Sequence, residues 1–171
     1  MAALDEAKHA ASIVSDAGGR IVGRTRLQKI AFIFEAAGVG AGFSFRYRHY
    51  GPYSDELTTA SRMAVLLGML QEVEHPASWG GFYSTFTSQL PSEANLADTR
   101  QRLAQETVSS DAIDLELMAT ALFLACEGAG DPWGETAHRK PDKATSTRLD
   151  RAKELYRRVR AVRTPRPLPA I

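Results

Sequence analysis

The chain has 171 residues, of which 44% are hydrophobic and 24% are charged. This composition is typical of a folded globular protein and excludes a chain that is disordered throughout. The length suits one hydrophobic core and is too short for two full-sized domains. No apolar run reaches the roughly 18–20 residues of a membrane helix, and acidic and basic residues interrupt the N-terminus where a signal peptide is apolar. We therefore expect a cytoplasmic protein with no membrane partner.

The formal net charge of +1 conceals an uneven distribution of charge along the chain. Residues 139–171 contain 11 Lys and Arg but 3 Asp and Glu, whereas residues 1–138 contain 10 basic and 17 acidic side chains. The two parts attract each other, so we expect a basic C-terminal helix that lies on an acidic body rather than a nucleic-acid surface. A second basic group lies in residues 20–48, which hold six Arg and Lys against Glu35 alone.

Two helices are predicted before residue 40. Residues 4–17 are rich in alanine and contain no helix breaker, which favours a helix that ends at the following glycine pair. In the next helix, Leu27, Ile30 and Phe34 recur at helical spacing and predict a buried stripe. Thr25 is the candidate N-cap of this helix.

The stretch RYRHYGPYSDEL, residues 46–57, combines a strand, a turn and the start of a helix. From Phe43 onwards the pattern alternates with a period of two, which places aromatic rings on one face and arginines on the other. Pro52 cannot donate a backbone hydrogen bond, so the strand is expected to stop near Gly51. Ser54 is the candidate N-cap of a third helix, whose first turn carries two acids.

The rest of the chain is predicted as a hairpin followed by helices. The segments QEVEH and GGFYSTFTS are typical of two short strands, so that three helices precede a hairpin, in the order of a winged helix. Helices are expected at about residues 92–106, 111–127 and 145–162, and the middle one is apolar nearly all round. The segment GAGDPWGE is expected to break the chain, and the tail TPRPLPAI, with three prolines, to be disordered or polyproline-like.

These elements predict an α+β fold that is mostly helical. Residues 1–163 would form a single compact domain, and residues 164–171 a disordered tail. Within the domain, residues 1–90 would form a winged-helix-like part with three helices, a short strand and a β-hairpin. Residues 91–163 would form a helical part that packs on it.

No catalytic, metal or cofactor motif is present in the sequence. Cys126 is the only cysteine, which excludes an internal disulfide and a thiolate zinc site, and its apolar neighbours predict a buried thiol. The sequence GVGAG follows a helix and precedes a strand, the reverse of a nucleotide-binding loop. His49 stands near a strand end, where a base could act, but no nucleophile or carboxylate lies beside it in sequence. We therefore predict a non-enzymatic protein without metal or cofactor.

A group of basic and aromatic side chains is the best candidate for a binding surface, because arginine and tyrosine dominate the hot spots of protein interfaces. The group would form if the second helix and the aromatic strand pack together. A solvated face with incidental charge is the alternative. The predicted partner-binding residues are Arg24, Arg26, Lys29, Arg46, Arg48, His49, Tyr50 and Tyr53.

The order of these motifs resembles the YwgA-like group of small bacterial proteins and, more distantly, the Panacea domain of SocA-like antitoxins. The resemblance covers about residues 10–160. It rests on GRTRLQKIAFIFEAAG, on FRYRHYGPYSDELTTASRMAVLLGML, on the GGFYSTFT hairpin, and on the later AIDLELMATALFLACEG and KPDKATSTRLDRAKELYRRVR helices. For the Panacea group it implies a mostly helical, non-enzymatic domain that neutralises a toxin by direct binding. A transcription-regulator label is attached to YwgA-like proteins.

The leading hypothesis is a cytoplasmic protein-binding module, such as an antitoxin or a defence-associated regulator, that binds a partner protein directly. The alternative is a winged-helix regulator that binds DNA. Against it, the third helix begins with Asp55 and Glu56 and has Arg62 as its only basic residue, so its carboxylates would repel phosphate. An enzyme would need a pocket in which His49 meets a carboxylate. The sequence leaves DNA binding and homo-oligomer formation open.

Overall fold

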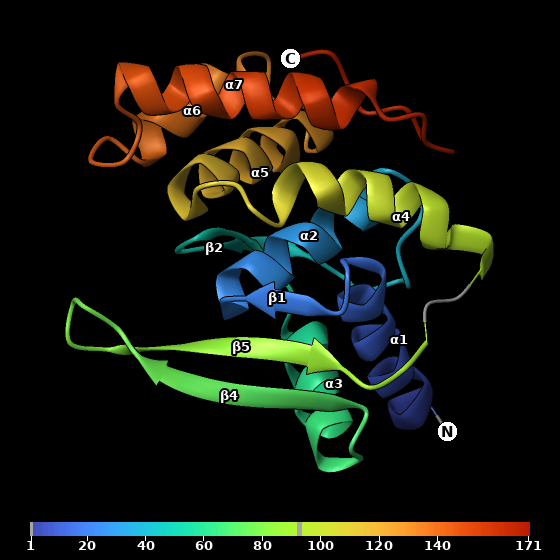
Figure 1. Ribbon diagram of the computed structural model, residues 1–171. Coiled ribbons are helices and arrows are strands. Elements are labelled where there is room, and N and C mark those ends of the chain that lie inside the picture. The colour runs from blue at the N-terminus through green and yellow to red at the C-terminus, as the bar shows by residue number, and fades with distance from the viewer. Residues whose placement is uncertain (1, 92–93) are drawn as a thin grey trace.

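The computed structural model describes residues 2–91 and 94–171, without the side chains of residues 94–97. These residues form a mostly helical α+β fold, as predicted (Figure 1). The elements are α1 (Ala2–Asp16), β1 (Arg20–Val22), α2 (Arg24–Ala36), β2 (Arg46–Arg48), β3 (Gly51–Tyr53), α3 (Asp55–Leu66), β4 (Leu70–Pro76), β5 (Phe82–Ser88), α4 (Ala94–Thr107), α5 (Ala112–Cys126), α6 (Pro132–Arg139) and α7 (Ser146–Ala161). None of the described helices is both long enough and apolar enough to cross a bilayer.

The N-terminal half has the predicted winged-helix-like order of three helices followed by a hairpin. Its antiparallel sheet has the strand order β1-β5-β4, and Ile21 of β1 is paired with Phe86 of β5. Both side chains are buried, together with Leu70 of β4, in the core that they share with α1, α2 and α3. The β4–β5 hairpin is longer than β1, so its tip projects beyond the rest of the sheet (Figure 1).

The predicted aromatic strand is instead a small hairpin of two short strands. β2 pairs with β3, so that Arg46 lies opposite Tyr53 and Arg48 opposite Gly51. The chain reverses here because Gly51 has a φ of 91°, a conformation that residues with a side chain rarely adopt. The predicted cap of the next helix is confirmed, since Ser54 Oγ accepts a hydrogen bond from the amide of Leu57 at 3.1 Å.

Four local predictions were wrong. β1 was missed because three residues are too few to show a strand period. Helix α2 begins two residues earlier than expected, at Arg24, with Gly23 rather than Thr25 at the N-cap position. The segment expected to break the chain, residues 128–135, includes the first half of α6, which starts with a proline and is capped by Asp131, both ordinary signals for a helix start. Cys126, predicted to be buried, is exposed at the end of α5.

The C-terminal half packs on the N-terminal half around α5, which is buried over most of its length, as its apolar sequence predicted. The basic helix α7 lies against α5 and α4. Its Arg151 forms an ion pair with Asp114 of α5 at 2.7 Å, and Arg158 pairs with Glu106 of α4 at 3.0 Å. The basic helix therefore lies on an acidic body, as the charge distribution indicated.

The tail, residues 164–171, for which the prolines predict a disordered or polyproline-like segment, runs along the surface between α7 and the end of α2. The amide of Arg166 donates to the carbonyl of Ala37 at 3.0 Å, and the hydroxyl of Tyr156 donates to the carbonyl of Pro169. Leu168 is buried in the core cluster. The prolines leave fewer backbone amides without a partner, and burial of this leucine adds hydrophobic stabilisation.

The close approach of Gly51 to α5 generates a first prediction. A Cβ atom at this position would lie 2.5 Å from Thr120 Oγ1, in addition to the strain of a positive φ. We expect Gly51→Ala to cost about 2–4 kcal/mol of unfolding free energy, from backbone strain plus overpacking. Gly128→Ala is the matched control, since Gly128 has a similar φ of 89° but open space around its Cβ position. Urea denaturation of both variants measures the difference, and equal losses would contradict a tight contact at Gly51.

Candidate functional site

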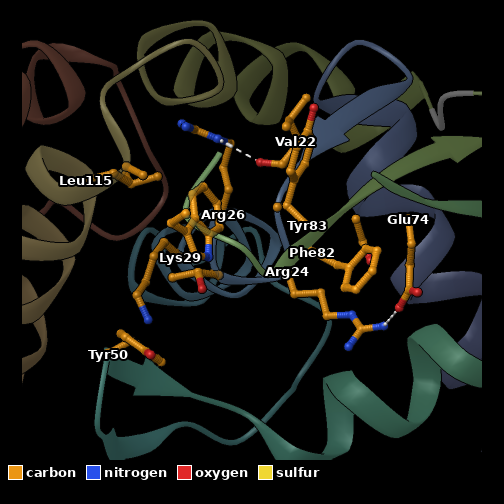
Figure 2. Close-up of a pocket in the computed structure, with 14 residues that line it drawn as sticks. Val22, Arg24, Arg26, Lys29, Tyr50, Glu74, Phe82, Tyr83 and Leu115 are labelled. Atoms are coloured by element: carbon orange, nitrogen blue, oxygen red, sulfur yellow. Dashed lines mark hydrogen bonds and ion pairs between the residues drawn. The ribbon is translucent and has the colours of Figure 1, made fainter. Parts of the chain in front are cut away.

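A cleft of about 670 Å³ lies where the N-terminus of α2, the tip of the β4–β5 hairpin, the start of α5 and the β2–β3 turn come together (Figure 2). Four elements that are distant in sequence therefore supply its walls. The volume falls within the range of about 300–1,000 Å³ that is usual for ligand sites. The residues that line it include Val22, Arg24, Arg26, Lys29, Tyr50, Glu74, Trp79, Phe82, Tyr83 and Leu115.

One wall of the cleft is aromatic and exposed. Trp79 is 75% exposed and Phe82 is 70% exposed, and both come from the hairpin tip. The ring of Tyr83 stacks on His75 of the neighbouring strand, with centroids 5.1 Å apart. The tip is closed by a hydrogen bond from the amide of Ala77 to the carbonyl of Gly81 at 2.7 Å. Large aromatic side chains in water at the edge of a concave surface are typical of a binding site.

Two arginines of α2 line the cleft, and their partners differ. Arg24 pairs with Glu72 at 2.7 Å and with Glu74 at 3.4 Å, which ties the start of α2 to strand β4. Arg26 donates instead to backbone carbonyls, from Nε to Val22 at 3.1 Å and from Nη1 to Thr107 at 3.0 Å. Among the described residues, no carboxylate lies within ion-pair distance of Arg26. Arg24 is thus paired with two acids, whereas Arg26 forms no ion pair with a described acid and is attracted by Asp111 only at longer range.

Lys29 lies deeper in the same cleft and is only 1% exposed. Its Nζ atom donates to the carbonyl of Pro52 at 2.8 Å. Burial lowers the pKa of Lys29 from 10.5 to about 7, because the charged ammonium is poorly solvated there. Glu116 partly offsets this shift, whereas the positive charges of Lys140 and Lys143 add to it. The Lys29 amine is therefore close to its titration midpoint at neutral pH.

Glu116 of α5 is the centre of a buried ionic group beneath the β2–β3 turn. Its carboxylate pairs with Lys140 at 2.7 Å and with Lys143 at 2.9 Å. Burial alone would raise the pKa of Glu116, but the hydrogen bonds and charges of the two lysines together hold that pKa below its usual value. Lys140 Nζ also donates to the carbonyl of His49 at 3.1 Å. Lys29 and Lys140 thus hold the two ends of the turn that carries Tyr50 to the cleft.

The eight predicted binding residues do not form one continuous surface. Arg24, Arg26, Lys29 and Tyr50 line the cleft, as expected for a shared site. Arg46 and Arg48 both bind Asp55 at the start of α3, and the Tyr53 hydroxyl lies 2.6 Å from that of Thr58. His49 lines a second hollow of about 470 Å³ together with Tyr47 and with three basic residues at and after the end of α6. Arg46 and Arg48 lie apart from the residues of α2 because the pairing of β2 with β3 directs both arginines to Asp55 at the start of α3.

Sequence reasoning missed the hairpin aromatics and the buried acid. The segment GGFYSTFTS predicts a strand, but Phe82 and Tyr83 occur side by side next to a glycine pair, where a core strand would alternate. Glu116 lies within an otherwise apolar helix, and an acid in such a position has to be paired. Its partners lie more than twenty residues further along the chain, so no local pattern identifies them. Among the described residues, no group of three His, Cys, Asp or Glu could hold a metal ion.

The low pKa of Lys29 predicts a specific pH dependence of stability. The unfolded chain binds the lysine proton more tightly than the folded protein, so the free energy of unfolding should rise with pH above about pH 7, by at most about 1.4 kcal/mol per unit. We expect Lys29→Met to flatten this rise between about pH 7 and pH 8.5. Lys8→Met, at an exposed position on α1, should keep the wild-type slope. Urea denaturation at several pH values measures the change of unfolding free energy with pH. Identical slopes for all three proteins would contradict a lowered pKa of the buried Lys29 amine.

Removal of the buried Glu116 carboxylate should strongly lower the free energy of unfolding. We expect Glu116→Gln to lose about 3–5 kcal/mol of unfolding free energy, because Lys140 then stays buried without its counter-charge. The matched control is Glu135→Gln, which breaks the more exposed Glu135–Arg139 pair within α6 and should cost less than about 0.5 kcal/mol. Chemical denaturation compares the two variants. Similar small losses would mean that the buried group does not hold the turn.

No protein-family model, curated protein or solved structure matches this chain. The resemblance to the YwgA-like and Panacea groups therefore rests on the sequence motifs alone and stays a prediction. The cleft has to be interpreted from its own geometry and charge.

Proposed function

We propose that the protein is a non-enzymatic protein-binding module that holds a segment of a partner protein in the cleft between α2 and the β4–β5 hairpin. The observation that carries this proposal is the exposed aromatic wall, with Trp79 and Phe82 in water beside a concave surface. Burial of such rings against a partner releases their apolar surface from water, and tryptophan and tyrosine are enriched among the residues that dominate binding energy. Tyr50, which is 52% exposed, adds a further ring on the far side of the cleft.

The walls of the cleft are held in place before any partner arrives, which supports binding at low entropic cost. The Arg24–Glu74 pair joins the start of α2 to β4, as the dashed line in Figure 2 marks. The β2–β3 turn is held by the two buried lysines, and Lys143 lies over the ring of Tyr50 at 4.7 Å. A preorganised surface loses less conformational entropy on binding than a flexible one.

The kind of module follows from the motifs of the sequence. The resemblance to the Panacea group favours an antitoxin or a defence-associated regulator that acts by direct binding, with a toxin as the partner. The arrangement of the cleft suits such a role, because its charged groups are engaged in ion pairs and hydrogen bonds that fix its shape. Binding alone, without a chemical step, is sufficient for neutralisation.

DNA binding by the winged-helix-like half has less support. Asp55 at the start of α3 already holds Arg46 and Arg48, which removes two cations from phosphate contact. The hairpin, residues 70–88, contains Glu72 and Glu74 but no lysine or arginine. Proteins that bind DNA need a basic surface, because phosphate contacts supply most of their affinity. A duplex-binding assay over a range of salt tests this alternative, since real phosphate contacts weaken steeply as salt rises.

Co-purification from the native host tests the binding function. We expect the tagged protein to retain one partner in stoichiometric amount, and we expect the Trp79→Ala, Phe82→Ala double variant to lose it, with affinity reduced by about 100-fold or more. Leu66→Ala is the matched control, because Leu66 is an equally exposed apolar residue on α3 that does not line the cleft. The affinity for the purified partner is then measured by calorimetry. A partner retained equally by all three proteins would move the binding site away from the cleft.

A further inference from the structure

We infer that the segment held in the cleft is acidic and carries an aromatic or large apolar residue, so that a carboxylate meets the basic floor while the apolar side chain enters beside the hairpin. This inference rests on the proposed function, because it names the chemistry of the partner segment at the same site. Two independent features of the cleft support it: basic groups on its floor that form no ion pair with a described acid, and an apolar wall.

The floor of the cleft carries positive charge that the chain does not neutralise. Arg26 and Lys29 donate to backbone carbonyls, and no described carboxylate lies within ion-pair distance of either. Asp111 acts on Arg26 only at longer range. Glu74 is the only carboxylate among the lining residues, and it pairs with Arg24. A partner carboxylate would therefore supply the counter-charge that is missing on the floor.

The start of α2 adds to this positive potential. Its first turn consists of Arg24, Thr25 and Arg26, all of which line the cleft, and it contains no acid. No side chain caps its first amides, because Gly23 occupies the N-cap position. The partial positive charge of a helix N-terminus thus acts in the same direction as Arg26 and the protonated fraction of Lys29. Its contribution reinforces the side chains and would not by itself define a site.

The protonation of Lys29 also favours an acidic segment. Its pKa of about 7 reflects burial among Glu116 on α5, Lys140 after α6, and Lys143 in the following connection. A carboxylate that approached this group would favour the charged ammonium and raise its pKa. Binding would then take up protons near neutral pH, and affinity for an acidic segment should fall as the pH rises above about 7.

The opposite wall suits an aromatic or large aliphatic side chain. In Figure 2, Phe82 and Tyr83 lie on one side of the open space, and Leu115 lies on the other beside Lys29. Trp79 contributes a third ring from the hairpin tip. Aromatic pairs in offset or edge-to-face geometry contribute about 0.5–1.5 kcal/mol beyond the burial of their area. A ring from the partner would complete this wall.

A single-stranded nucleic acid also combines aromatic bases with negative charge, but the cleft suits it less well. Nucleic-acid grooves present a continuous line of accessible cations along the backbone. Here the basic lining residues are only Arg24, Arg26 and Lys29, and Arg24 is already paired with Glu72 and Glu74 on β4. Only a few carboxylates, rather than a run of phosphates, can be accommodated beside those acids.

A displayed library of random peptides tests the inference with the full chain as bait. We expect the selected peptides to share an aromatic or large apolar residue with Asp or Glu close to it in sequence, and to bind the Trp79→Ala, Phe82→Ala variant poorly. The matched probe is the best peptide with its acids replaced by Asn or Gln. Fluorescence anisotropy should show binding at least about tenfold weaker for this amide peptide, as expected for the loss of a charge-assisted hydrogen bond.

The outcomes separate this inference from the proposed function. If the amide peptide binds as tightly as the acidic one, the acidic class is wrong while a peptide-binding cleft remains. If the wild-type protein selects no peptide over the double variant, both proposals fail. If oligothymidine displaces the selected peptide at moderate salt, the inferred acidic peptide is wrong and the ligand of the cleft is a single-stranded nucleic acid. Circular dichroism of the double variant checks that the exposed substitutions leave the fold intact.

Discussion

The candidate site depends on the ion pairs that the buried carboxylate of Glu116 forms with two lysines. This carboxylate lies on α5 in a region that excludes water, and its charge is sustained by Lys140 and Lys143. Without it, two lysines would be buried or half-buried with no counter-charge, a situation that costs several kcal/mol. With it, Lys140 can donate to the carbonyl of His49 while Lys29 donates to that of Pro52. One acid in the C-terminal half thereby fixes the turn that presents Tyr50 in the N-terminal half.

A second buried ion pair joins the two halves in the same way. Arg100 of α4 pairs with Asp16 of α1 at 3.0 Å, donates to the carbonyl of Val39, and lies over the ring of Phe34. Buried ion pairs of this kind contribute little net stability but tolerate few alternative arrangements of their surroundings. The helical half is therefore part of the site, because the start of α5 supplies one wall of the cleft and its buried acid positions another. A winged-helix-like unit alone would lack both.

The sequence predicted most of the fold because the long elements have strong periodic and capping signals. Helix α5 is apolar nearly all round, and Ser54 is a strong N-cap signal for α3, so the predictions of both helices were correct. The short strand β1 and the capped helix α6 were missed, since neither is long enough to show a period. For the site, four of the eight residues meet in the cleft, but pairing between β2 and β3 decides where the strand arginines point. That pairing depends on contacts with α5, which no local pattern contains.

The distribution of counter-charges separates the arginines that hold the structure from the groups that remain for a partner. Arg24, Arg46 and Arg48 were all candidates, and all three form ion pairs within the chain: Arg24 with Glu72 and Glu74, and Arg46 and Arg48 with the one carboxylate of Asp55. Arg26 and Lys29 donate to backbone carbonyls, and Arg26 also to the Ser110 hydroxyl, but neither forms an ion pair with a described carboxylate. Both line the cleft together with exposed aromatic rings. A carbonyl offsets part of the cost of burying a cation but leaves its charge in place. A segment with both a carboxylate and an apolar side chain would pair with these groups and cover the rings at the same time, because the cleft presents both kinds of surface together.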